Sequence, residues 1–528
     1  MSKSVLSLLL ALGGLLGCSS SEPAQETTGE PVSGGVAVIA LEADPGTLNP
    51  VRMSTAQAAR VFGLLQPGLV RLDPDTAEWT PGLARRWTFS SDSTGVTLFL
   101  DGRLRWSDGE AFTADDVIAT WDLYRDDAVA YPRLSRLAAI ESAEAVDDTT
   151  LRVTYAVRPA DPLIALAHDV LPAHVIETLD RSAPGTWSLG REPVTLGRFR
   201  LAEWATNDRL ALERNPHHPG PPPRLDGLEI VVVPDGASRL LQLRTGEAHF
   251  VGSVTKGQLE PLREDPAIEV LPVEGRSVAF LQFDLEDPRL ADDRVRRAIS
   301  HAIDRAEICE RVFFGHARPA ASLVPPVSWA HAASLEAIVH DPARANSLLD
   351  DAGWTREGDG LRTRDGEELR LDLLSVAGDP ERETVTVLLQ SQLRQVGIEL
   401  RLQPRELRSM IQSLRTEDFD LALMQLSGPV DAEVRPFLAS NAPYNFGGWS
   451  DPEFDQLATV ATTSPDRVRA VAAARALQEI VAREQPIAPL YHPATLVAHR
   501  TRLRGVQPSW ISPYDGAESW WLAPDDAP

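Results

Sequence analysis

The sequence predicts an α/β protein of more than one domain, and three observations lead to this fold class. The chain has 528 residues, too many for one compact domain. Apolar and polar residues alternate at 151–157 and 398–402, the pattern of half-buried strands. Segments 113–124 and 380–396 place apolar residues at helical spacing behind a capping residue. Because the two patterns intermingle, we expect mixed sheets flanked by helices.

The composition supports a folded, acidic protein. Hydrophobic residues make up 43% of the chain and charged residues 24%, as in globular proteins. The 51 basic and 76 acidic residues give a net charge of −25, which repels nucleic-acid phosphates and anionic lipid headgroups. We therefore expect no nucleic-acid partner. Lysine occurs only at Lys3 and Lys256, so arginine carries almost all of the positive charge.

The first eighteen residues are typical of an export signal. Lys3 precedes an apolar run at 5–16, which is too short to span a bilayer. The sequence Leu-Leu-Gly-Cys at 15–18 resembles a lipobox, so we expect cleavage before Cys18 and its lipidation. An ordinary secretory signal is the alternative. The prediction is an exported protein, lipid-anchored to the membrane and facing the periplasm or the cell exterior.

The segment after Cys18 is expected to be a tether. Residues 19–33 are mostly polar, Pro and Gly, a composition that does not fold by itself. Cys309 is the second cysteine, so the lipidated chain has no internal disulfide.

Strands and helices follow in a regular order from Gly35. The first strand is predicted at 36–39 before a turn at 44–46, and another at 96–100. Thr113, with an acidic residue three positions later, is typical of a helix start. An Asp-Pro pair gives the same signal at Asp341, Asp379 and Asp451. One continuous helix is predicted at 294–313, with Cys309 as an inert core thiol, and a hairpin turn at 358–360.

Nine separated segments resemble family 5 of the bacterial extracellular solute-binding proteins, which includes dipeptide, oligopeptide and nickel-complex receptors. The most extended is Trp106-Ser107-Asp108-Gly109 with the following 112–117. The other segments are 47–50, 81–87, 213–216, 295–305, 345–353, 392–398, 419–420 and 444–446.

The resemblance implies a two-lobed, periplasmic-binding-protein-like fold of type II with an extra subdomain and a hinge of two chain crossings. Lobe I is expected at 34–74, 190–278 and 495–528, the inserted subdomain at 75–189, and lobe II at 279–494. Ligand would be enclosed between the lobes.

No catalytic motif is present in the sequence. It lacks a Gly-x-Ser-x-Gly elbow, a His-Glu-x-x-His helix and a phosphate-binding Gly-x-x-x-x-Gly-Lys loop. Adjacent His217 and His218 point to different sides of an extended loop, so a solvated loop is favoured over a metal site. We therefore predict no catalytic residue, cofactor or metal.

The resemblance implies one ligand-binding residue directly. In peptide-binding relatives an aspartate after the Phe-Asp strand holds the ligand α-amine, and Asp431 matches that position best. Relatives have Gly-Trp before this stretch where this chain has Gln425 and Leu426. That difference leaves a metal chelate, an oligosaccharide or an opine-like compound open as ligand, with Gln425 as a further candidate contact.

Four other residues are candidates with open alternatives. Thr47 and Asn49 follow the first strand and either face the cleft or form a satisfied turn. Tyr444 and Asn445 offer an aromatic face and an amide, or else a packed ring and a turn residue. Trp106 is expected in the core.

Together these features predict a monomeric substrate-binding lipoprotein of an ABC importer that delivers di- or oligopeptides to a permease and its ATPase. A ligand-presenting sensor is an alternative of the same class. A secreted hydrolase is the alternative of another class, which the missing motifs disfavour.

Overall fold

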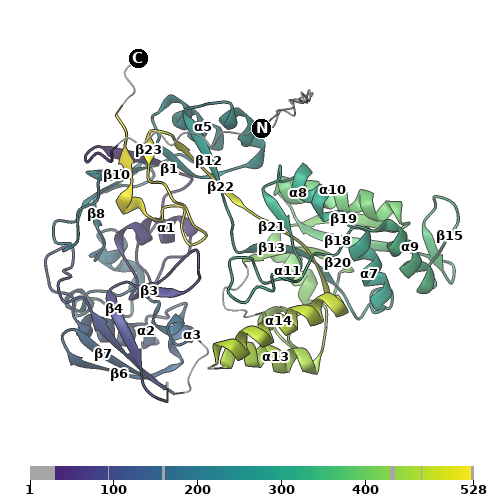
Figure 1. The fold of residues 1–528 in the computed structure, drawn as a ribbon, viewed down its shortest axis with the longest axis horizontal. Helices are drawn as coiled ribbons and strands as arrows, with labels where there is room; N and C mark the ends of the chain where they lie inside the picture. Colours follow the sequence, from purple (N-terminus) through teal and green to yellow (C-terminus); the bar gives the residue numbers. More distant parts are fainter. Residues whose placement is uncertain (1–29, 93, 157–160, 428–433, 465, 525–528) are drawn as a thin grey trace, which may run out of the picture.

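Two large sheets form the centres of two bodies, which lie at the left and right of Figure 1. The computed structural model describes residues 30–524 apart from 93, 157–160, 428–433 and 465. Cys18 and Asp431 lie outside the described residues, so the predictions on them stay predictions.

The left body, lobe I, contains a seven-stranded sheet of order β12-β22-β11-β1-β10-β9-β8. Central β1 is parallel to β10 and β11, and the outer pairs are antiparallel. Apolar clusters cover both faces of the sheet, packed with α1, α5 and α6. The bounds are β1 Val36–Leu41, β8 Phe199–Ala205, β9 Arg209–Arg214, β10 Gly227–Val232, β11 Phe250–Val254, β12 Ile268–Val273, β22 Thr495–Arg500, α1 Ala56–Leu65, α5 Gly236–Thr245 and α6 Leu259–Arg263.

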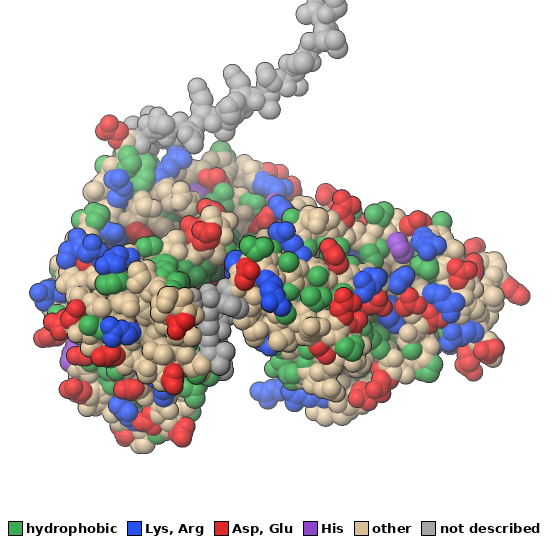
Figure 2. All heavy atoms as spheres, turned by 60° about the horizontal axis from the view of Figure 1, so that its bottom comes forward, with side chains coloured by type: hydrophobic (Ala, Val, Ile, Leu, Met, Phe, Trp, Pro, Cys, Tyr) green, Lys and Arg blue, Asp and Glu red, His purple; other side chains and the backbone are tan. Residues whose placement is uncertain are grey.

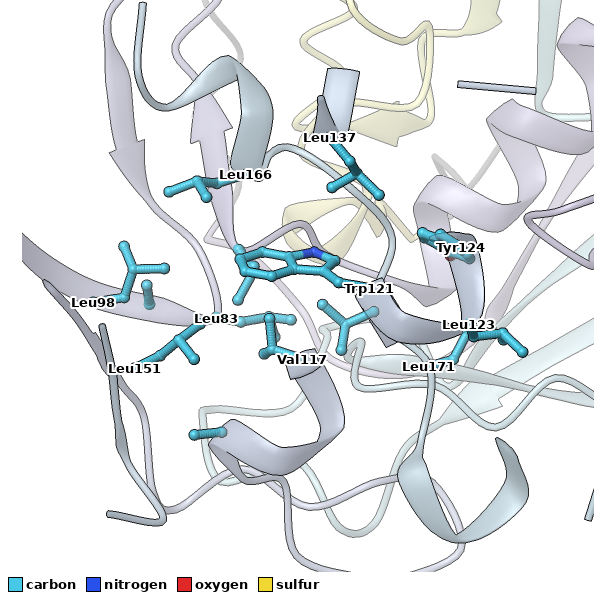
Figure 3. Close-up of a cluster of buried hydrophobic side chains, with 14 of the residues drawn as sticks. Leu83, Leu98, Val117, Trp121, Leu123, Tyr124, Leu137, Leu151, Leu166 and Leu171 are labelled. Carbon is cyan, nitrogen blue, oxygen red and sulfur yellow. The ribbon is translucent and has the colours of Figure 1, made fainter. Parts of the chain in front are cut away.

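A smaller unit, the subdomain, lies below lobe I in Figure 1 and has its own core. Trp121 is 1% exposed at the centre of that core, among leucines from the sheet and from neighbouring loops (Figure 3). Trp106 is fully buried in the same cluster, as predicted. Its sheet has the order β4-β5-β7-β6. The bounds are β4 Ala84–Phe89, β5 Gly95–Leu100, β6 Ile140–Asp147, β7 Thr150–Tyr155, α2 Ala114–Arg125, α3 Leu134–Leu137 and α4 Ala173–Ile176.

The right body, lobe II, contains a six-stranded sheet of order β14-β21-β13-β20-β18-β19. Parallel β18–β19 and β18–β20 pairs adjoin antiparallel ones, so the sheet is mixed. The strand bounds are β13 Ser277–Phe283, β14 Ala317–Pro319, β18 Arg370–Val376, β19 Glu399–Arg405, β20 Leu421–Ser427 and β21 Ile487–Pro493. The helix bounds are α7 Asp293–Ala302, α8 Arg305–Arg311, α9 Pro342–Asp351, α10 Pro380–Gln395, α11 Leu407–Arg415, α12 Arg435–Leu438, α13 Pro452–Thr463 and α14 Arg467–Glu484.

Short strands complete the molecule. They are β2 Val70–Leu72, β3 Trp79–Pro81, β15 Thr355–Arg356, β16 Arg362–Arg364, β17 Glu367–Glu368, β23 Leu503–Arg504 and β24 Trp521–Leu522. The antiparallel β15–β16 pair confirms the hairpin turn predicted at 358–360.

The chain passes between the two large sheets at two places. Residues 274–276 connect β12 to β13, and Ala494 connects β21 to β22. The two-lobed fold class with two crossings is therefore confirmed. The residue boundaries predicted for the lobes stay predictions.

The predicted helix starts are confirmed. Asp341, Asp379 and Asp451 each accept a backbone N–H at the start of α9, α10 and α13. The Asp116 carboxylate accepts the Thr113 N–H at 2.8 Å before α2. Short-range capping therefore sets these helix ends.

One predicted element is wrong in part. The single helix expected at 294–313 is two helices, α7 and α8, because the chain turns at Ile303 and Asp304. Asp304 starts a new helix by accepting the Glu307 N–H at 2.8 Å, and its own N–H donates to Gln392 at 3.1 Å. Cys309 lies in α8, and burial raises the pKa of its thiol to about 12.

Over the part of the chain that the structure describes, no helix is both long and apolar enough to cross a membrane.

Candidate ligand site between the lobes

A groove separates the two bodies in the space-filling view (Figure 2). In the subdomain, Trp79 and Asp161 are fixed to each other. The Trp79 indole N–H donates to both Asp161 carboxylate oxygens, at 2.9 and 2.8 Å, and the Leu163 N–H donates to one of them at 3.1 Å. A half-buried carboxylate and an indole face are therefore held in place on this side.

The lobe II side presents a cation on an aromatic ring. Arg467 begins α14, and its guanidinium carbon lies 3.5 Å from the centre of the Trp329 ring. Trp329 packs against the core cluster that α13 and α14 share. Cation–π contact fixes the direction of the arginine and leaves its edge available to an anion.

The charges on the two sides are opposite, and they influence each other across the groove. Burial raises the pKa of Asp161, while Trp79, the Leu163 N–H and the Arg467 charge oppose that rise. Burial lowers the pKa of Arg467, and the carboxylates of Asp161 and Glu78 oppose it. One end of α14 lies next to the subdomain in Figure 1, consistent with this interaction. We call Glu78, Asp161 and Arg467 the rim charges.

A second cation lies at the hinge. Arg276 belongs to the first crossing, and its guanidinium carbon is 5.8 Å from the centre of the Trp510 ring. The Trp510 indole N–H donates to the Pro74 carbonyl at 2.8 Å, which fixes the ring on lobe I. An arginine and an aromatic face therefore meet beside the crossing.

The predicted residues Thr47 and Asn49 lie at the joint between lobe I and the subdomain. Asn49 is 2% exposed; its amide donates to the Pro184 carbonyl at 2.9 Å, and its side-chain oxygen accepts the Val51 N–H at 3.0 Å. The Thr47 hydroxyl accepts the Asn49 N–H at 3.2 Å. These contacts are those of the satisfied turn, the alternative that the sequence left open.

Two of the predicted lobe II residues also make internal contacts. The Asn445 amide donates to the carbonyls of Ala439 and Trp449, at 3.0 and 2.7 Å. Tyr444 is 45% exposed and stacks on Phe437 with ring centres 5.5 Å apart. Tyr444 therefore has an accessible ring, whereas the Asn445 amide is engaged in its own turn.

Gln425 lies on β20 opposite Ala279 and is half-buried. Within the described residues, no hydrogen bond or ion pair joins the 47–49 loop to Gln425, Tyr444 or Asn445. The predicted residues thus occupy separate places, and their role in ligand binding stays a prediction. His218 uses Nδ1 to accept the Gly220 N–H at 3.1 Å, a contact inside its own loop.

The groove residues Trp79, Asp161, Arg276, Trp329 and Arg467 were not predicted from the sequence. They come from five distant segments, and no local pattern distinguishes them from other tryptophans and charged residues. Only the fold brings Trp79, Asp161, Trp329 and Arg467 near one another and Arg276 against Trp510.

Comparison with known proteins identifies the family. The model of the bacterial extracellular solute-binding proteins, family 5, matches residues 78–446, more than half of the chain. The chain belongs to this family. Its members are receptors that bind solutes outside the cytoplasm, and they are not enzymes.

Similar proteins cover nearly the whole family 5 chain. The peptide transport periplasmic protein SapA of Salmonella typhimurium is 26% identical over 546 residues, which cover 97% of this chain and 96% of SapA. The structure of AppA from Bacillus subtilis in complex with a nonapeptide is 22% identical, with a TM-score of 0.73 and coverage of 94% of this chain and 100% of AppA. NikA from Brucella suis in complex with Fe(III)-EDTA is 22% identical, with a TM-score of 0.82 and coverage of 93% and 100%. These two structures share the two-lobed fold.

Proposed function

We propose that this protein is a lipid-anchored receptor of an ABC importer that captures di- or oligopeptides between its lobes and releases them unchanged to a membrane permease. One observation carries the proposal: the chain links two separate sheets through two short crossings, and a groove lies between the two bodies (Figure 2). Such an architecture permits hinge closure over a ligand. SapA is named for peptide transport, and AppA was solved with a nonapeptide bound.

The ends of a free peptide require charged partners. Burial of an ammonium or carboxylate without a partner costs on the order of several kcal/mol. We assign the ligand amine to Asp431 and the ligand carboxylate to Arg276, the arginine beside the crossing. The Trp510 face next to Arg276 then covers apolar parts of the peptide.

Thermal unfolding of the chain from residue 19 onward tests the peptide assignment. A ligand at about 100 times its Kd stabilises the folded protein by about 2.7 kcal/mol, which appears as a rise of a few degrees in Tm. Defined dipeptide and tripeptide pools should raise Tm. If saturating pools of two- to nine-residue peptides leave Tm unchanged, the peptide assignment fails.

A matched peptide pair tests the carboxylate partner. Arg276→Met should weaken a peptide with a free C-terminus at least tenfold, because the buried carboxylate loses its partner. The same peptide with an amidated C-terminus should bind both proteins equally. Equal loss for both peptides would contradict the assignment of Arg276.

A non-peptide solute is the second candidate function. The Gln425-Leu426 pair differs from the peptide-binding pattern, and NikA, of the same fold, was solved with a metal chelate. Native mass spectrometry of receptor purified from its own cells separates the candidates by ligand mass.

Labelling of cells with a radioactive fatty acid tests the lipid anchor. The protein should incorporate the label, and the Cys18→Ser variant should not.

A further inference from the structure

Lys256 occupies a site where this chain departs from its use of arginine. It is the only lysine in the described part of the chain, which otherwise carries its permanent positive charges on arginine. Lys256 follows β11 of lobe I, begins a short 3-10 helix, Lys256–Gln258, and is 9% exposed. A compact ammonium with three donor directions fits a closed site more readily than a planar guanidinium.

The Lys256 ammonium touches both the hinge and lobe II. It donates to the carbonyl of Ala494, the crossing residue between β21 and β22, at 2.9 Å. Its nitrogen lies 3.9 Å from a carboxylate oxygen of Glu381, in the first turn of α10, and 5.6 Å from the ring centre of Phe313. One side chain of lobe I therefore reaches the crossing, α10 of lobe II and Phe313, which follows α8. We call Lys256, Glu381 and the Ala494 carbonyl the hinge tie.

The environment of the hinge tie is partly dry. Burial lowers the pKa of Lys256, and the carboxylates of Glu381 and Asp379 oppose that effect. Burial raises the pKa of Glu381, and Lys256 opposes it. Charges with little solvent interact more strongly than exposed pairs, so lengthening this contact carries a free-energy cost.

The helices that carry Glu381 and Arg467, α10 and α14, lie on opposite sides of β21. In Figure 1, α8 and α10 lie above β21, whereas α14 and the subdomain lie below it. A second contact joins the lobes, since Arg263 of α6 lies 2.8 Å from His316 after α8. Rotation about the crossings that narrows the lower groove widens the upper side. Closure and the hinge tie therefore work against each other.

We propose that the hinge tie opposes closure of the lobes and so sets the free energy that a ligand must supply to close them. The proposal rests on the proposed closure of the receptor over a ligand, but not on the identity of that ligand. A contact shifts a two-state equilibrium only by the difference in its strength between the states, and in this proposal the contact between Lys256 and Glu381 is longer in the closed state. Lys256 is then a positioning residue for closure.

The distance between the lobes, measured without ligand, tests the proposal. Leu241 on lobe I is 61% exposed and Val387 on lobe II is 55% exposed, so cysteines there accept a donor and an acceptor dye while Cys309 stays buried. In single-molecule fluorescence transfer, Lys256→Met and Glu381→Gln should each raise the closed population about fivefold or more, and the double variant little further. Both dyes are on helices that lie above β21 in Figure 1, α5 and α10, so closure appears as a longer distance.

Two further measurements make the result specific. Arg152→Met removes an exposed pair with Glu144 inside the subdomain, at 3.2 Å, and should leave the populations unchanged. Circular dichroism and Tm identify any variant that fails to fold, in which case Glu381→Gln alone decides. Unchanged populations in folded variants, or a shift toward the open form, would overturn the proposal. Failure of peptide binding would leave this readout intact, so the two proposals fail separately.

Discussion

Lobe II meets the rest of the molecule on two sides of the crossing strands, and the two contacts differ in physical character. At the hinge tie, a buried ammonium makes a direct 2.9 Å hydrogen bond to Ala494. At the rim, Arg467 is exposed and Asp161 half-buried, and among the described residues no ion pair within 4 Å joins the two. Short-range contacts therefore define the hinge, whereas a screened attraction acts at the rim.

Because the two contacts differ in this way, salt and substitutions should affect the rim and the hinge side differently. Salt and neutral substitutions at the rim should change how readily the lobes approach without changing the stability of either lobe. Loss of buried contacts at the hinge side should change stability at any salt concentration. Three predictions compare the two sides, in order of decreasing expected effect.

The largest effect is expected for Arg305→Met on the hinge side. Arg305 is 4% exposed and donates to the carbonyls of Pro489 and Ser300, at 2.7 and 2.9 Å, and burial lowers its pKa to about 10. Its removal takes this donor away from the carbonyls of Pro489 in β21 and Ser300 in α7 and should cost about 3 kcal/mol of unfolding free energy. Urea unfolding at two salt concentrations measures it. Arg311→Met, on the exposed side of α8, should cost less than about 0.5 kcal/mol; equal losses would break the comparison.

The second effect is a loss of stability in acid, due to His492 beside the second crossing. His492 is 7% exposed, and burial lowers its pKa to about 4. The unfolded chain binds a proton near pH 6.5, so the contribution is complete above pH 6.5 and falls as the pH drops toward 4. By pH 4.5 the loss of unfolding free energy amounts to about 2.5 kcal/mol.

His492→Asn keeps a donor to the Ser277 carbonyl, 3.1 Å from His492 Nδ1, and removes the titration. The difference in unfolding free energy between pH 7 and pH 4.5 should therefore shrink by about 2 kcal/mol in this variant. An unchanged pH dependence would exclude His492 as its source.

The smallest effect is expected at the rim. Asp161→Asn keeps an acceptor for the Trp79 indole and removes the charge that faces Arg467. The closed population should fall two- to threefold at 50 mM salt and by less at 500 mM, since exposed pairs contribute about 0.5 kcal/mol and salt screens them. Unfolding free energy should change little. A salt-independent effect as large as that of Arg305→Met would contradict a screened attraction.

Local sequence signals predicted the elements well where the interactions are local. The Asp-Pro pairs before α9, α10 and α13 act within one turn of helix, so they needed no tertiary information. The break between α7 and α8 was missed because the apolar periodicity continues through Ile303, whereas the turn is stabilised by Gln392 from α10. A contact 88 residues away leaves no trace in a local pattern.

The groove residues were harder to predict for the same reason. Trp79 and Asp161 are 82 residues apart in the sequence. Trp329 and Arg467 come from two further segments, both in lobe II. The order of family segments predicted the two-lobed fold, because many weak matches add up along the chain. Asn49 shows the limit of such matches, since its side chain serves the joint with the subdomain.

The place of β22 has a consequence for how the molecule assembles as it is synthesised. This strand lies between β12 and β11 in the lobe I sheet, yet it follows all of lobe II in the chain. The subdomain and lobe II are each continuous, so each can fold as soon as its own residues have emerged. The lobe I sheet cannot be completed until β22 pairs between β12 and β11, and the second crossing forms in that same step. The receptor thus acquires its hinge last.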